Sequence, residues 1–569
     1  MSWRTLTGFS SVSRIRVAAL ERSDHVVLRR DHVFASGSNA GTKSSAPLES
    51  SCGGMLGRGR PRPGIDNPVC PAMLRRIMKQ IRPFLLLVSL LLAARCMAAD
   101  RPNVIYILSD DVGYGDIGCY GANQVKTPNL DRLAREGLRF TDAHATASVC
   151  TPTRFAFMTG RYAWRQPGTG IAAGNATLLI PVGTPTVASV LKAAGYRTGI
   201  VGKWHLGLGE TPPDFNREIK PGPNELGFDY SFIIPATGDR TPCVFVEDRF
   251  VVGLDPKDPI AVSYGQRIGS DPTGVERPDL LKIKAGPGHG QAIINGISRI
   301  GYMTGGQKAR WVDEDIADTL TKKAVAFIER QKAGQPFFLY LAPHDIHEPM
   351  VPHPRFRGTS GCGWRGDVIH QLDWSVGEVL AALDRLGLAQ DTLVIFTSDN
   401  GGAIKNTYDD GTNDLHAKQP PNGVLRGFKG ALYEGGNRVP FLARWPGRIP
   451  AGGESAALMA HLDTLPMLAA LAGQKIPAGG SPDGVNVLAA LLGEKGAKGR
   501  ETLVLQNNHQ APLALRVGTW KLIQRPNASS ELYDLASDLK EEHDLAARET
   551  ERVKTMGAQL AAERAKSGG

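Results

Sequence analysis

The sequence predicts an α/β protein built on a mixed, mostly parallel sheet flanked by helices, and three observations support this class. Short, nearly continuous apolar runs such as Asn103–Leu108 are typical of strands that are buried on both faces. Segments with helix start and stop signals separate these runs. Hydrophobic residues make up 42% of the 569 residues and charged residues 21%, which indicates a globular protein with a large core.

The predicted helices and strands alternate along the chain after the first strand. Thr127 and Pro128 start a helix that Gly137 ends, because threonine is a good N-cap and proline is tolerated in the first helical turn. The same pattern of a helix followed by a strand then recurs three times. The expected pairs are helix 186–194 with strand 197–201, helix 313–331 with strand 336–341, and helix 368–386 with strand 392–397.

Two regions depart from this alternation. Residues 207–312 are rich in Gly, Pro and Asp, with short extended pieces around 244–252, and a stretch this long predicts a functional insertion. After about residue 500 the pattern changes to strand-like alternation over 513–523 and a charged helix over 541–565. We therefore place the main domain at residues 100–499 and a small C-terminal α+β subdomain at 500–569.

The N-terminal region carries the marks of an export signal over residues 73–99. A basic segment from Met73 precedes an apolar run over 84–94, and the small residues Ala98 and Ala99 fit a cleavage site. The run is too short for a stable membrane span, which needs about 20 apolar residues. We expect an exported protein, periplasmic or secreted, and lysosomal or extracellular if eukaryotic. Residues 1–72 are interpreted as a disordered leader or as a start assigned too far upstream.

The charge distribution excludes a broad nucleic-acid interface. Residues 1–99 hold 15 Lys and Arg against 5 Asp and Glu, whereas the remaining residues hold 51 of each kind. The net charge of +10 therefore belongs to the segment that export would remove. A neutral body lacks the positive field that nucleic-acid binding requires, so anion recognition must be local.

Polar residues follow four of the predicted strands at the point where each strand ends. Ligands of parallel α/β sheets gather beyond the carboxyl ends of the strands, so these residues are expected to form one site. They are Asp110 and Asp111, Lys203 and His205, His344 and His347, and Asp399 and Asn400. Asp110, Asp111, Asp399 and Asn400 offer only oxygen ligands, which suit Ca²⁺, with Mg²⁺ as the alternative.

Cys150 is the most distinctive residue. It precedes a short helix predicted over 155–159, with Pro152 in the first turn and Arg154 one turn on, a geometry that favours an anion beside residue 150. Four of the seven cysteines remain after cleavage of the signal. Cys243 and Cys362 could pair, and the sequence leaves that question open.

Several motifs resemble those of the sulfatase family in the alkaline phosphatase superfamily. Cys150-Thr-Pro-Thr-Arg154 is similar to the signature whose cysteine is oxidised to formylglycine, and the segments 110–121, 195–205 and 425–440 are similar to three further family motifs in the same order. The resemblance runs from about Pro102 to Ala546. It implies an alkaline-phosphatase-like fold and the hydrolysis of sulfate esters.

The resemblance also implies roles for individual residues. Asp110, Asp111, Asp399 and Asn400 match the family's metal ligands, usually for Ca²⁺, and the modified Cys150 completes the metal shell. Arg154 matches the residue that steadies the formylglycine hydrate, and His205 the one beside its second hydroxyl. Lys203 and Lys429 match lysines that hold sulfate oxygens. His347 is preferred as the acid that protonates the leaving oxygen, with His344 as its rival.

Two other functions remain open on the sequence. A phosphodiesterase or phosphonate monoester hydrolase of the same superfamily can share the formylglycine signature, and a non-catalytic protein could bind sulfated glycans. The expected partners are a sulfated small molecule or glycan and the maturation enzyme that generates formylglycine. The sequence does not define the sulfated substrate or the oligomeric state.

Overall fold

The computed structural model describes residues 101–404, 407–411, 419–508, 511–526 and 528–566. The predicted signal peptide at 73–99 and the leader at 1–72 lie outside the described residues. Within them, no helix combines the length and the apolar character that crossing a membrane requires.

A ten-stranded mixed sheet forms the centre of the described part, in the order β15-β2-β14-β13-β1-β12-β4-β5-β6-β7. Its middle strands run parallel to their neighbours, and β1 and β12 are buried along their whole length. This is the predicted fold class, and it is confirmed. The strands are β1 (Asn103–Ser109), β2 (Leu138–Phe140), β4 (Arg197–Lys203), β5 (Tyr230–Ile234), β6 (Val246–Glu247), β7 (Phe250–Val251), β12 (Phe337–Ala342), β13 (Thr392–Ser398), β14 (Phe441–Arg444) and β15 (Gly453–Ser455).

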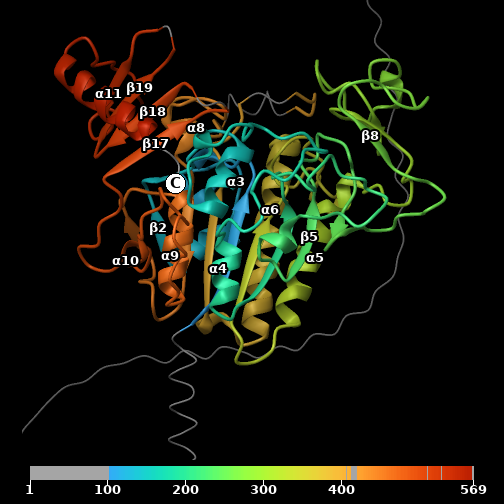
Figure 1. Cartoon of the computed structure of the whole chain (residues 1–569), viewed down its shortest axis with the longest axis horizontal. Helices are drawn as coiled ribbons and strands as arrows, with labels where there is room; N and C mark the ends of the chain where they lie inside the picture. Colours follow the sequence, from blue (N-terminus) through green and yellow to red (C-terminus); the bar gives the residue numbers. More distant parts are fainter. Residues whose placement is uncertain (1–100, 405–406, 412–418, 509–510, 527, 567–569) are drawn as a thin grey trace, which may run out of the picture. The chain divides into compact units, whose positions relative to one another are not determined.

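Helices cover the two faces of this sheet (Figure 1). One layer contains α2 (Pro128–Glu136), α5 (Ile316–Glu329) and α6 (Gly363–Arg385), in which α6 contacts both of the others. The other layer contains α3 (Cys150–Thr159), α4 (Val187–Ala193), α9 (Thr464–Leu471) and α10 (Leu488–Leu491). The predicted start and end of α2 are correct, with Thr127 as N-cap and Gly137 as C-cap.

The region 207–312 is only partly an insertion. β5 pairs in parallel with β4, and β6 and β7 continue the same sheet at its edge. The functional insertion expected over 207–312 therefore includes strands of the central sheet, and β5 was not predicted because this short strand lies in a Gly- and Pro-rich sequence. Small two-stranded pieces follow: β8 (Ala261–Ser263) with β11 (Tyr302–Thr304), and β9 (Ile293–Ile294) with β10 (Ile297–Ser298).

The C-terminal residues form a four-stranded antiparallel sheet, as the sequence predicts. It contains β17 (Thr502–Gln506), β18 (Leu513–Val517), β19 (Trp520–Gln524) and β20 (Glu531–Asp534). The last helix, α11 (Thr550–Ala565), starts nine residues later than predicted. Turns occupy the segment before it, where Asp538 and Asp544 accept backbone hydrogen bonds and so favour turns over helix.

The C-terminal sheet shares a hydrophobic core with the main part of the chain. Ala156, Tyr162 and Trp164 pack with buried residues of β17, β18 and β19 in one cluster. Ser148 donates to the carbonyl of Gln506 over 3.0 Å and Gln506 donates to that of Thr146 over 3.0 Å. The segment before α3 is therefore held directly against β17.

The described cysteines are all free thiols. Cys243 is buried and Cys362 half-buried, and they do not form the disulfide that the sequence left open. Stability must therefore come from the packed core and from buried polar networks.

Candidate active site

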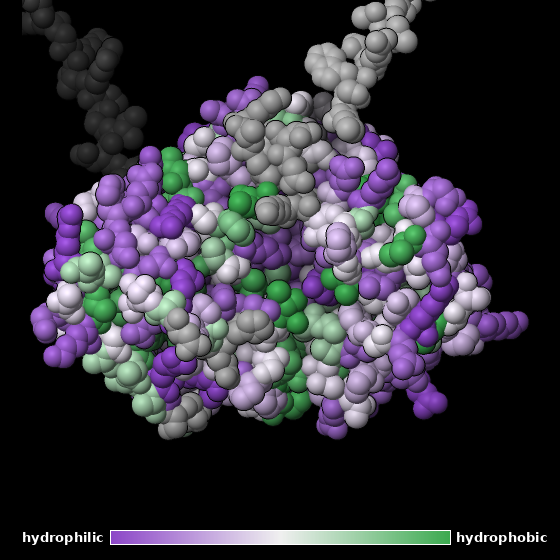
Figure 2. All heavy atoms as spheres, turned by 90° about the horizontal axis from the view of Figure 1, so that it is seen from above, coloured by the Kyte–Doolittle hydropathy of each residue, from purple (hydrophilic) through white to green (hydrophobic). Residues whose placement is uncertain are grey.

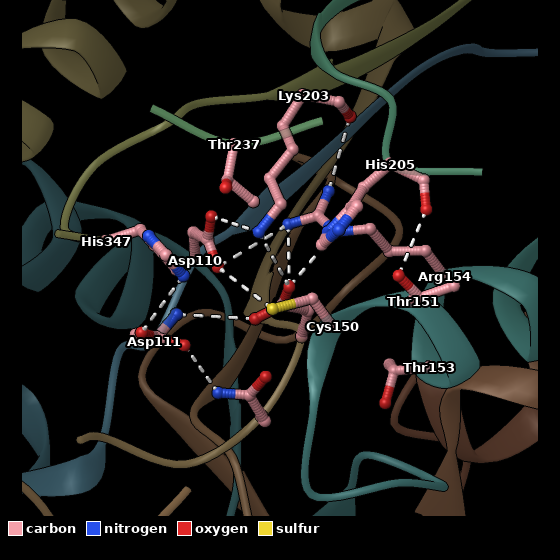
Figure 3. Close-up of polar contacts among 12 residues, drawn as sticks. Asp110, Asp111, Cys150, Thr151, Thr153, Arg154, Lys203, His205, Thr237 and His347 are labelled. Carbon is pink, nitrogen blue, oxygen red and sulfur yellow. Dashed lines mark hydrogen bonds and ion pairs between the residues drawn. The ribbon is translucent and has the colours of Figure 1, made fainter. Parts of the chain in front are cut away.

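The ten residues proposed for the site lie together where four neighbouring strands end. β13, β1, β12 and β4 are side by side in the sheet and parallel, so the segments that follow them meet at one edge. Figure 2 views this edge from above and shows hydrophilic side chains around a central hollow. Figure 3 shows how seven of these side chains converge, which are Asp110, Asp111, Cys150, Arg154, Lys203, His205 and His347. The other three join them through hydrogen bonds and ion pairs and are Asp399, Asn400 and Lys429.

Cys150 is the first residue of α3, a helix whose ten residues are all buried. The prediction placed the start of this helix at Phe155. It begins earlier because Pro152 fits the first turn, where backbone N–H groups have no intrahelical partner. The helix ends at Gly160, whose φ of 61° is left-handed and suits glycine. Cys150 therefore lies at the positive end of the helix dipole.

The Cys150 thiol is unsuited to act as a nucleophile in its unmodified form. It is 2% exposed, and its Sγ lies 3.8 Å from Asp110 Oδ1. Burial raises the pKa of the thiol to about 12. Because the thiolate is the reactive form of cysteine, this side chain stays protonated and inert near neutral pH.

Three buried carboxylates and one amide surround Cys150. Asn400 Nδ2 donates to Asp111 Oδ1 over 2.8 Å, and the backbone N–H of Asp111 donates to Asp399 Oδ1 over 3.3 Å. Burial and the nearby charge of Asp110 raise the pKa of Asp399. Asp111 has a φ of 61°, a left-handed conformation that is costly for a non-glycine residue and is typical of functional sites.

This cluster suits a hard divalent cation. The Oδ1 atom of Asn400 is buried and has no hydrogen-bond partner among the described residues, so the amide that contacts Asp111 has an unused oxygen acceptor. Ligand atoms of Asp110, Asp111 and Cys150, together with one from His347, lie within 4.8 Å of one another. Two of these four ligand atoms are carboxylate oxygens, and Asp399 and Asn400 add the further oxygens that calcium and magnesium prefer.

Each carboxylate is also paired with a cationic side chain of the protein. Lys203 Nζ lies 2.5 Å from Asp110 Oδ2, Lys429 Nζ 2.8 Å from Asp111 Oδ2, and Arg154 Nη2 2.7 Å from Asp399 Oδ2. Burial raises the pKa of Asp111, but Lys429, His347 and Lys203 together hold it below its usual range. The site thus combines acidic groups that can hold a cation with basic groups that can hold an anion.

His205 is fixed by two residues that the sequence did not single out. Its Nε2 lies 3.0 Å from the carbonyl oxygen of Ala172, and Thr151 Oγ1 donates to the His205 carbonyl over 3.2 Å. Thr151 Oγ1 also accepts from the Ala172 N–H over 3.1 Å. Burial and the charge of Lys203 lower the pKa of His205. A neutral ring that donates through Nε2 leaves Nδ1 as a bare acceptor, and Nδ1 is buried without a partner.

The two histidines after β12 have different surroundings. His344 Nε2 accepts from the Gly238 N–H over 2.9 Å. His347 Nε2 instead lies 3.9 Å from Asp111 Oδ2, and its Nδ1 is 2.6 Å from the Glu348 carbonyl oxygen. Burial and Lys429 lower the pKa of His347 to about 4. An anionic substrate next to His347 would favour its protonated form.

A second polar cluster next to the site was missed by the sequence reasoning. Arg240 Nη1 lies 2.7 Å from Asp239 Oδ2, and His289 Nε2 lies 3.2 Å from the same oxygen and 3.6 Å from Glu348 Oε1. The neighbouring Gly238 contacts His344, so the cluster borders the histidine side of the site. These residues do not follow a predicted strand, so the argument from strand ends could not find them. Only the composition of the region 207–312 indicated a functional loop there.

The chain matches two family models. The model described as Sulfatase covers residues 102–474, and the model described as N-sulphoglucosamine sulphohydrolase, C-terminal, covers residues 428–566.

Relatives and solved structures agree with these matches. The chain is 48% identical over 478 residues to an N-acetylgalactosamine-6-O-sulfatase of Bacteroides thetaiotaomicron, which covers 81% of this chain and 93% of the relative. Arylsulfatase A of Homo sapiens is 36% identical over 439 residues, 76% of each chain. A solved structure from work on the metabolism of multiple glycosaminoglycans by Bacteroides thetaiotaomicron has a TM-score of 0.80 and 47% identity, covering 82% of this chain and all of that one. A phosphonate monoester hydrolase of Agrobacterium radiobacter shares the fold at a TM-score of 0.51 and 18% identity.

Proposed function

Because this chain belongs to the sulfatase family and is a sulfate-ester hydrolase, we propose that it removes the 6-O-sulfate of N-acetylgalactosamine 6-sulfate residues in glycans. Family membership makes the chain an enzyme and rules out a non-catalytic glycan-binding module. The family also implies a formylglycine and a divalent cation. We propose Cys150 as the source of the formylglycine and Ca²⁺ as the cation.

The observation that carries the proposed reaction is the position of Cys150. A protonated, buried thiol at the start of α3 has no use as a nucleophile, but its Sγ lies beside Asp110, and the lysines that pair with Asp110 and Asp111 add positive charge nearby. Oxidation of this residue to an aldehyde would supply a hydrate with two hydroxyl groups, one to attack sulfur and one to release sulfate afterwards. The proposed ligands Asp110, Asp111, Asp399 and Asn400 would hold a cation that favours ionisation of a hydroxyl beside it.

The remaining site residues have roles that follow from their positions. Lys203 and Lys429 carry the positive charge that stabilises the sulfate oxygens as charge builds on them. Arg154 holds Asp399 through Nε and Nη2 at 3.0 and 2.7 Å, which fixes that carboxylate next to residue 150. His205 offers its unpartnered Nδ1 as the acceptor for a proton from the second hydroxyl.

His347 is proposed as the acid that protonates the leaving oxygen. Its Nε2 faces Asp111 at the centre of the site, whereas His344 Nε2 is already engaged by the Gly238 N–H. A leaving group on the His347 side would meet the cluster of Asp239, Arg240 and His289. Carboxylate, guanidinium and imidazole groups can hydrogen-bond sugar hydroxyls, so this side of the site suits a carbohydrate alcohol.

We also propose that the protein is exported and then carries formylglycine made by a maturation enzyme. The apolar run at 84–94 and the small residues at 98–99 support export. The similarity to a bacterial N-acetylgalactosamine-6-O-sulfatase over 93% of its length supports the substrate.

Peptide mass spectrometry and sulfate release together test this function. The protein is produced with a formylglycine-generating enzyme, and free sulfate is measured from N-acetylgalactosamine 6-sulfate, N-acetylgalactosamine 4-sulfate and N-acetylglucosamine 6-sulfate. We expect formylglycine at residue 150, preference for the first substrate, and no sulfate release by Cys150→Ala. Full activity with unmodified cysteine would overturn the nucleophile, and equal or higher activity on another sulfated sugar would overturn the substrate.

A further inference from the structure

A ring of hydrogen bonds joins α3, the helix that starts at Cys150, to His205. Thr151 Oγ1 donates to the His205 carbonyl over 3.2 Å and accepts from the Ala172 N–H over 3.1 Å. The Ala172 carbonyl oxygen in turn lies 3.0 Å from His205 Nε2. Figure 3 shows Thr151 beside Cys150, with its hydroxyl directed at the carbonyl of His205. One hydroxyl group, on the residue after Cys150, therefore holds both the backbone of His205 and the segment that contacts its ring.

The Thr151 hydroxyl serves these contacts and not its own helix. A threonine in a helix commonly donates to the carbonyl four residues before it, as Thr159 Oγ1 donates to the Phe155 carbonyl over 2.8 Å in α3. Thr151 is fully buried in the first turn, and its hydroxyl bonds to residues 54 and 21 positions away in the chain. These bonds therefore fix the positions of other segments relative to α3.

The backbone of His205 depends on such contacts. Its φ of 54° is a left-handed conformation that is costly for a non-glycine residue, so the surroundings must hold it. Arg154 Nη1 donates to the Lys203 carbonyl over 3.4 Å, while Thr151 donates to the carbonyl of His205. Two side chains of α3 thus hold the segment that carries Lys203 and His205, and they set its position relative to residue 150.

The segment that carries Ala172 is held from its other side by Tyr264. The Tyr264 hydroxyl accepts from the Gly174 N–H over 2.9 Å and donates to the Thr241 carbonyl over 2.5 Å. A Cβ atom at Gly174 would lie 1.9 Å from the Thr241 carbonyl oxygen, so only glycine permits this close approach. Thr151 and Tyr264 together fix the direction of the Ala172 carbonyl.

The Ala172 carbonyl determines which nitrogen of His205 carries the proton. A carbonyl oxygen only accepts hydrogen bonds, so a neutral His205 ring has its proton on Nε2. Nδ1 is then a bare acceptor, and it is buried without a partner among the described residues. A hydroxyl group that approached Nδ1 would satisfy this acceptor.

The proposed reaction uses this acceptor only in its second half. His205 Nδ1 accepts the proton of the second hydroxyl at residue 150, and the electron pair of that O–H bond forms the C=O bond of the aldehyde. The C–O bond to the sulfate group breaks at the same time, and sulfate leaves with the electron pair of that bond. The first half, attack on sulfur, leaves the second hydroxyl unchanged. A group that orients His205 should therefore affect the release of sulfate more than the attack.

We propose that Thr151 is a positioning residue for the release of sulfate, because its hydroxyl sets the tautomer and the orientation of His205 through Ala172 and through the His205 backbone. This role rests on the proposed function, since it takes residue 150 to be formylglycine and His205 to be the proton acceptor.

Three variants test this role. Thr151→Val has nearly the same shape as the wild type but lacks the hydroxyl, and Thr151→Ser keeps the hydroxyl. Tyr264→Phe loosens the Ala172 segment from the other side and lies outside the motif that contains Cys150. The formylglycine content of each variant is measured by peptide mass spectrometry, and all rates are given per modified molecule, so that incomplete maturation does not lower them.

Thr153→Val is the matched control. Thr153 is as fully buried as Thr151 and lies two residues further along α3. Its hydroxyl also donates to one carbonyl and accepts from one N–H, both of Ala147, over 2.8 and 3.3 Å. Thr153→Val therefore removes the same two kinds of hydrogen bond from the same helix without touching the ring around His205.

The first measurement follows a nitrophenyl sulfate by stopped flow and acid quench. In Thr151→Val we expect a burst of about one nitrophenol per modified site, followed by a steady rate that is about 10-fold to 100-fold below the wild type, because a small misplacement of a reacting group has this effect. Residue 150 should then retain sulfate in the quenched peptide. Tyr264→Phe should show the same change to a smaller extent, and Thr151→Ser and Thr153→Val should behave like the wild type.

The second measurement requires no turnover and no formylglycine. Crystal structures of the unmodified proteins should show that the contact between His205 Nε2 and the Ala172 carbonyl is lost in Thr151→Val and kept in Thr151→Ser and Thr153→Val. An unmoved His205 in Thr151→Val would overturn the positioning role, as would equal rate losses in Thr151→Val and Thr153→Val, or a slower steady rate without retained sulfate. Full activity with unmodified Cys150 would instead overturn the proposed function and its release step, and the crystal structures would still show whether Thr151 positions His205.

Discussion

Each carboxylate at the centre of the site faces a cationic side chain, and this pairing decides how the residues respond to substitution. A buried carboxylate without a partner is expensive, and Asp111 is 3% exposed. In the protein, Lys429 and a bound cation would share the compensation of Asp111. The contributions of Lys429 and of the cation to stability can be distinguished by removing the cation alone.

Removal of the cation should therefore lower the stability of the folded protein, because the buried charge of Asp111 is then less well compensated. We expect a chelator to lower the Tm of the wild type and Ca²⁺ to restore it, because a ligand at about 100 times its Kd stabilises the folded state by about 2.7 kcal/mol. In Asp111→Ala, activity should be lost and the Tm should no longer respond to Ca²⁺. Differential scanning calorimetry with Asp214→Ala, an exposed acid, as control measures both effects. A normal Ca²⁺ response in Asp111→Ala would show that the cation binds elsewhere.

The two histidines after β12 allow a second prediction for single residues. A general acid matters most when the leaving alcohol is poor, because proton donation then carries more of the barrier. We expect His347→Ala to lose far more kcat/KM on a sugar sulfate than on a nitrophenyl sulfate, by about 100-fold. His344→Ala should lower both alike, since His344 supports the Gly238 segment. Equal losses for His347→Ala, with a selective loss for His344→Ala, would reverse the two assignments.

The residues of the site differ in how far the sequence could reveal them. Asp110, Lys203 and Asp399 follow predicted strands, so topology alone placed them together. Asp239 and His289 lie in irregular segments and meet only through tertiary packing. Ala172 acts through its backbone carbonyl, and no sequence pattern reports the direction of a carbonyl group.

At the scale of elements, burial explains which boundaries could be predicted. β1 and β13 are buried along their whole length, and such strands read as continuous apolar runs. β5 was missed because its five residues follow a Gly- and Pro-rich segment in which the short 3₁₀ helix η4 (Pro223–Leu226) is the element directly before the strand. α11 buries only Met556 and Leu560 fully, so its weak apolar pattern could not mark its first residue.

A short helix that contacts α3 supports the strand that precedes Asp399. His461 begins the 3₁₀ helix η9 (His461–Asp463), and its Nε2 donates to the carbonyl of Ser398 at the end of β13 over 2.7 Å. Its Nδ1 lies 3.3 Å from the hydroxyl of Tyr106 on β1. Both contacts fit a neutral ring, and burial lowers the pKa of His461 from its usual 6.5 to about 4.

This histidine should make folding stability depend on pH. Between pH 6.5 and 4 the unfolded chain binds a proton at His461 that the folded protein does not, so its contribution to stability is lost as the pH falls through this window. His461→Gln keeps a donor for Ser398 but cannot titrate. We expect the wild type to lose about 3 kcal/mol more than His461→Gln between pH 7 and 4. Urea unfolding at both values measures the difference, and parallel losses would contradict a neutral buried ring.

For the whole molecule, the contacts of the C-terminal sheet indicate that it folds as one unit with the catalytic part. Lys521 on β19 lies 2.8 Å from Glu434 Oε1 and 2.8 Å from Glu541 Oε1, and the three side chains are fully buried. Glu434 starts α8 (Glu434–Asn437), five residues after Lys429 of the site. The C-terminal sheet therefore anchors the segment that carries Lys429, the lysine proposed to hold a sulfate oxygen. Figure 1 shows α8 between this sheet and the upper end of the central sheet.

Loss of Lys521 should accordingly affect the stability of the whole protein and the activity together. Lys521→Met leaves two buried carboxylates without their shared cation, and breaking a buried pair in this way costs about 3–5 kcal/mol. We expect the wild type to unfold in one calorimetric transition, and Lys521→Met to unfold in one transition at lower Tm with reduced kcat.

Lys554→Met on the exposed side of α11 is the control and should change neither the Tm nor kcat. Adding Glu541→Gln to Lys521→Met should restore part of the loss, because it removes the charge of Glu541, whereas Glu434 keeps its contact with Arg438. A separate early transition for the C-terminal sheet, with activity intact below it, would show instead that the two parts fold independently and that Lys429 is held in place without Lys521.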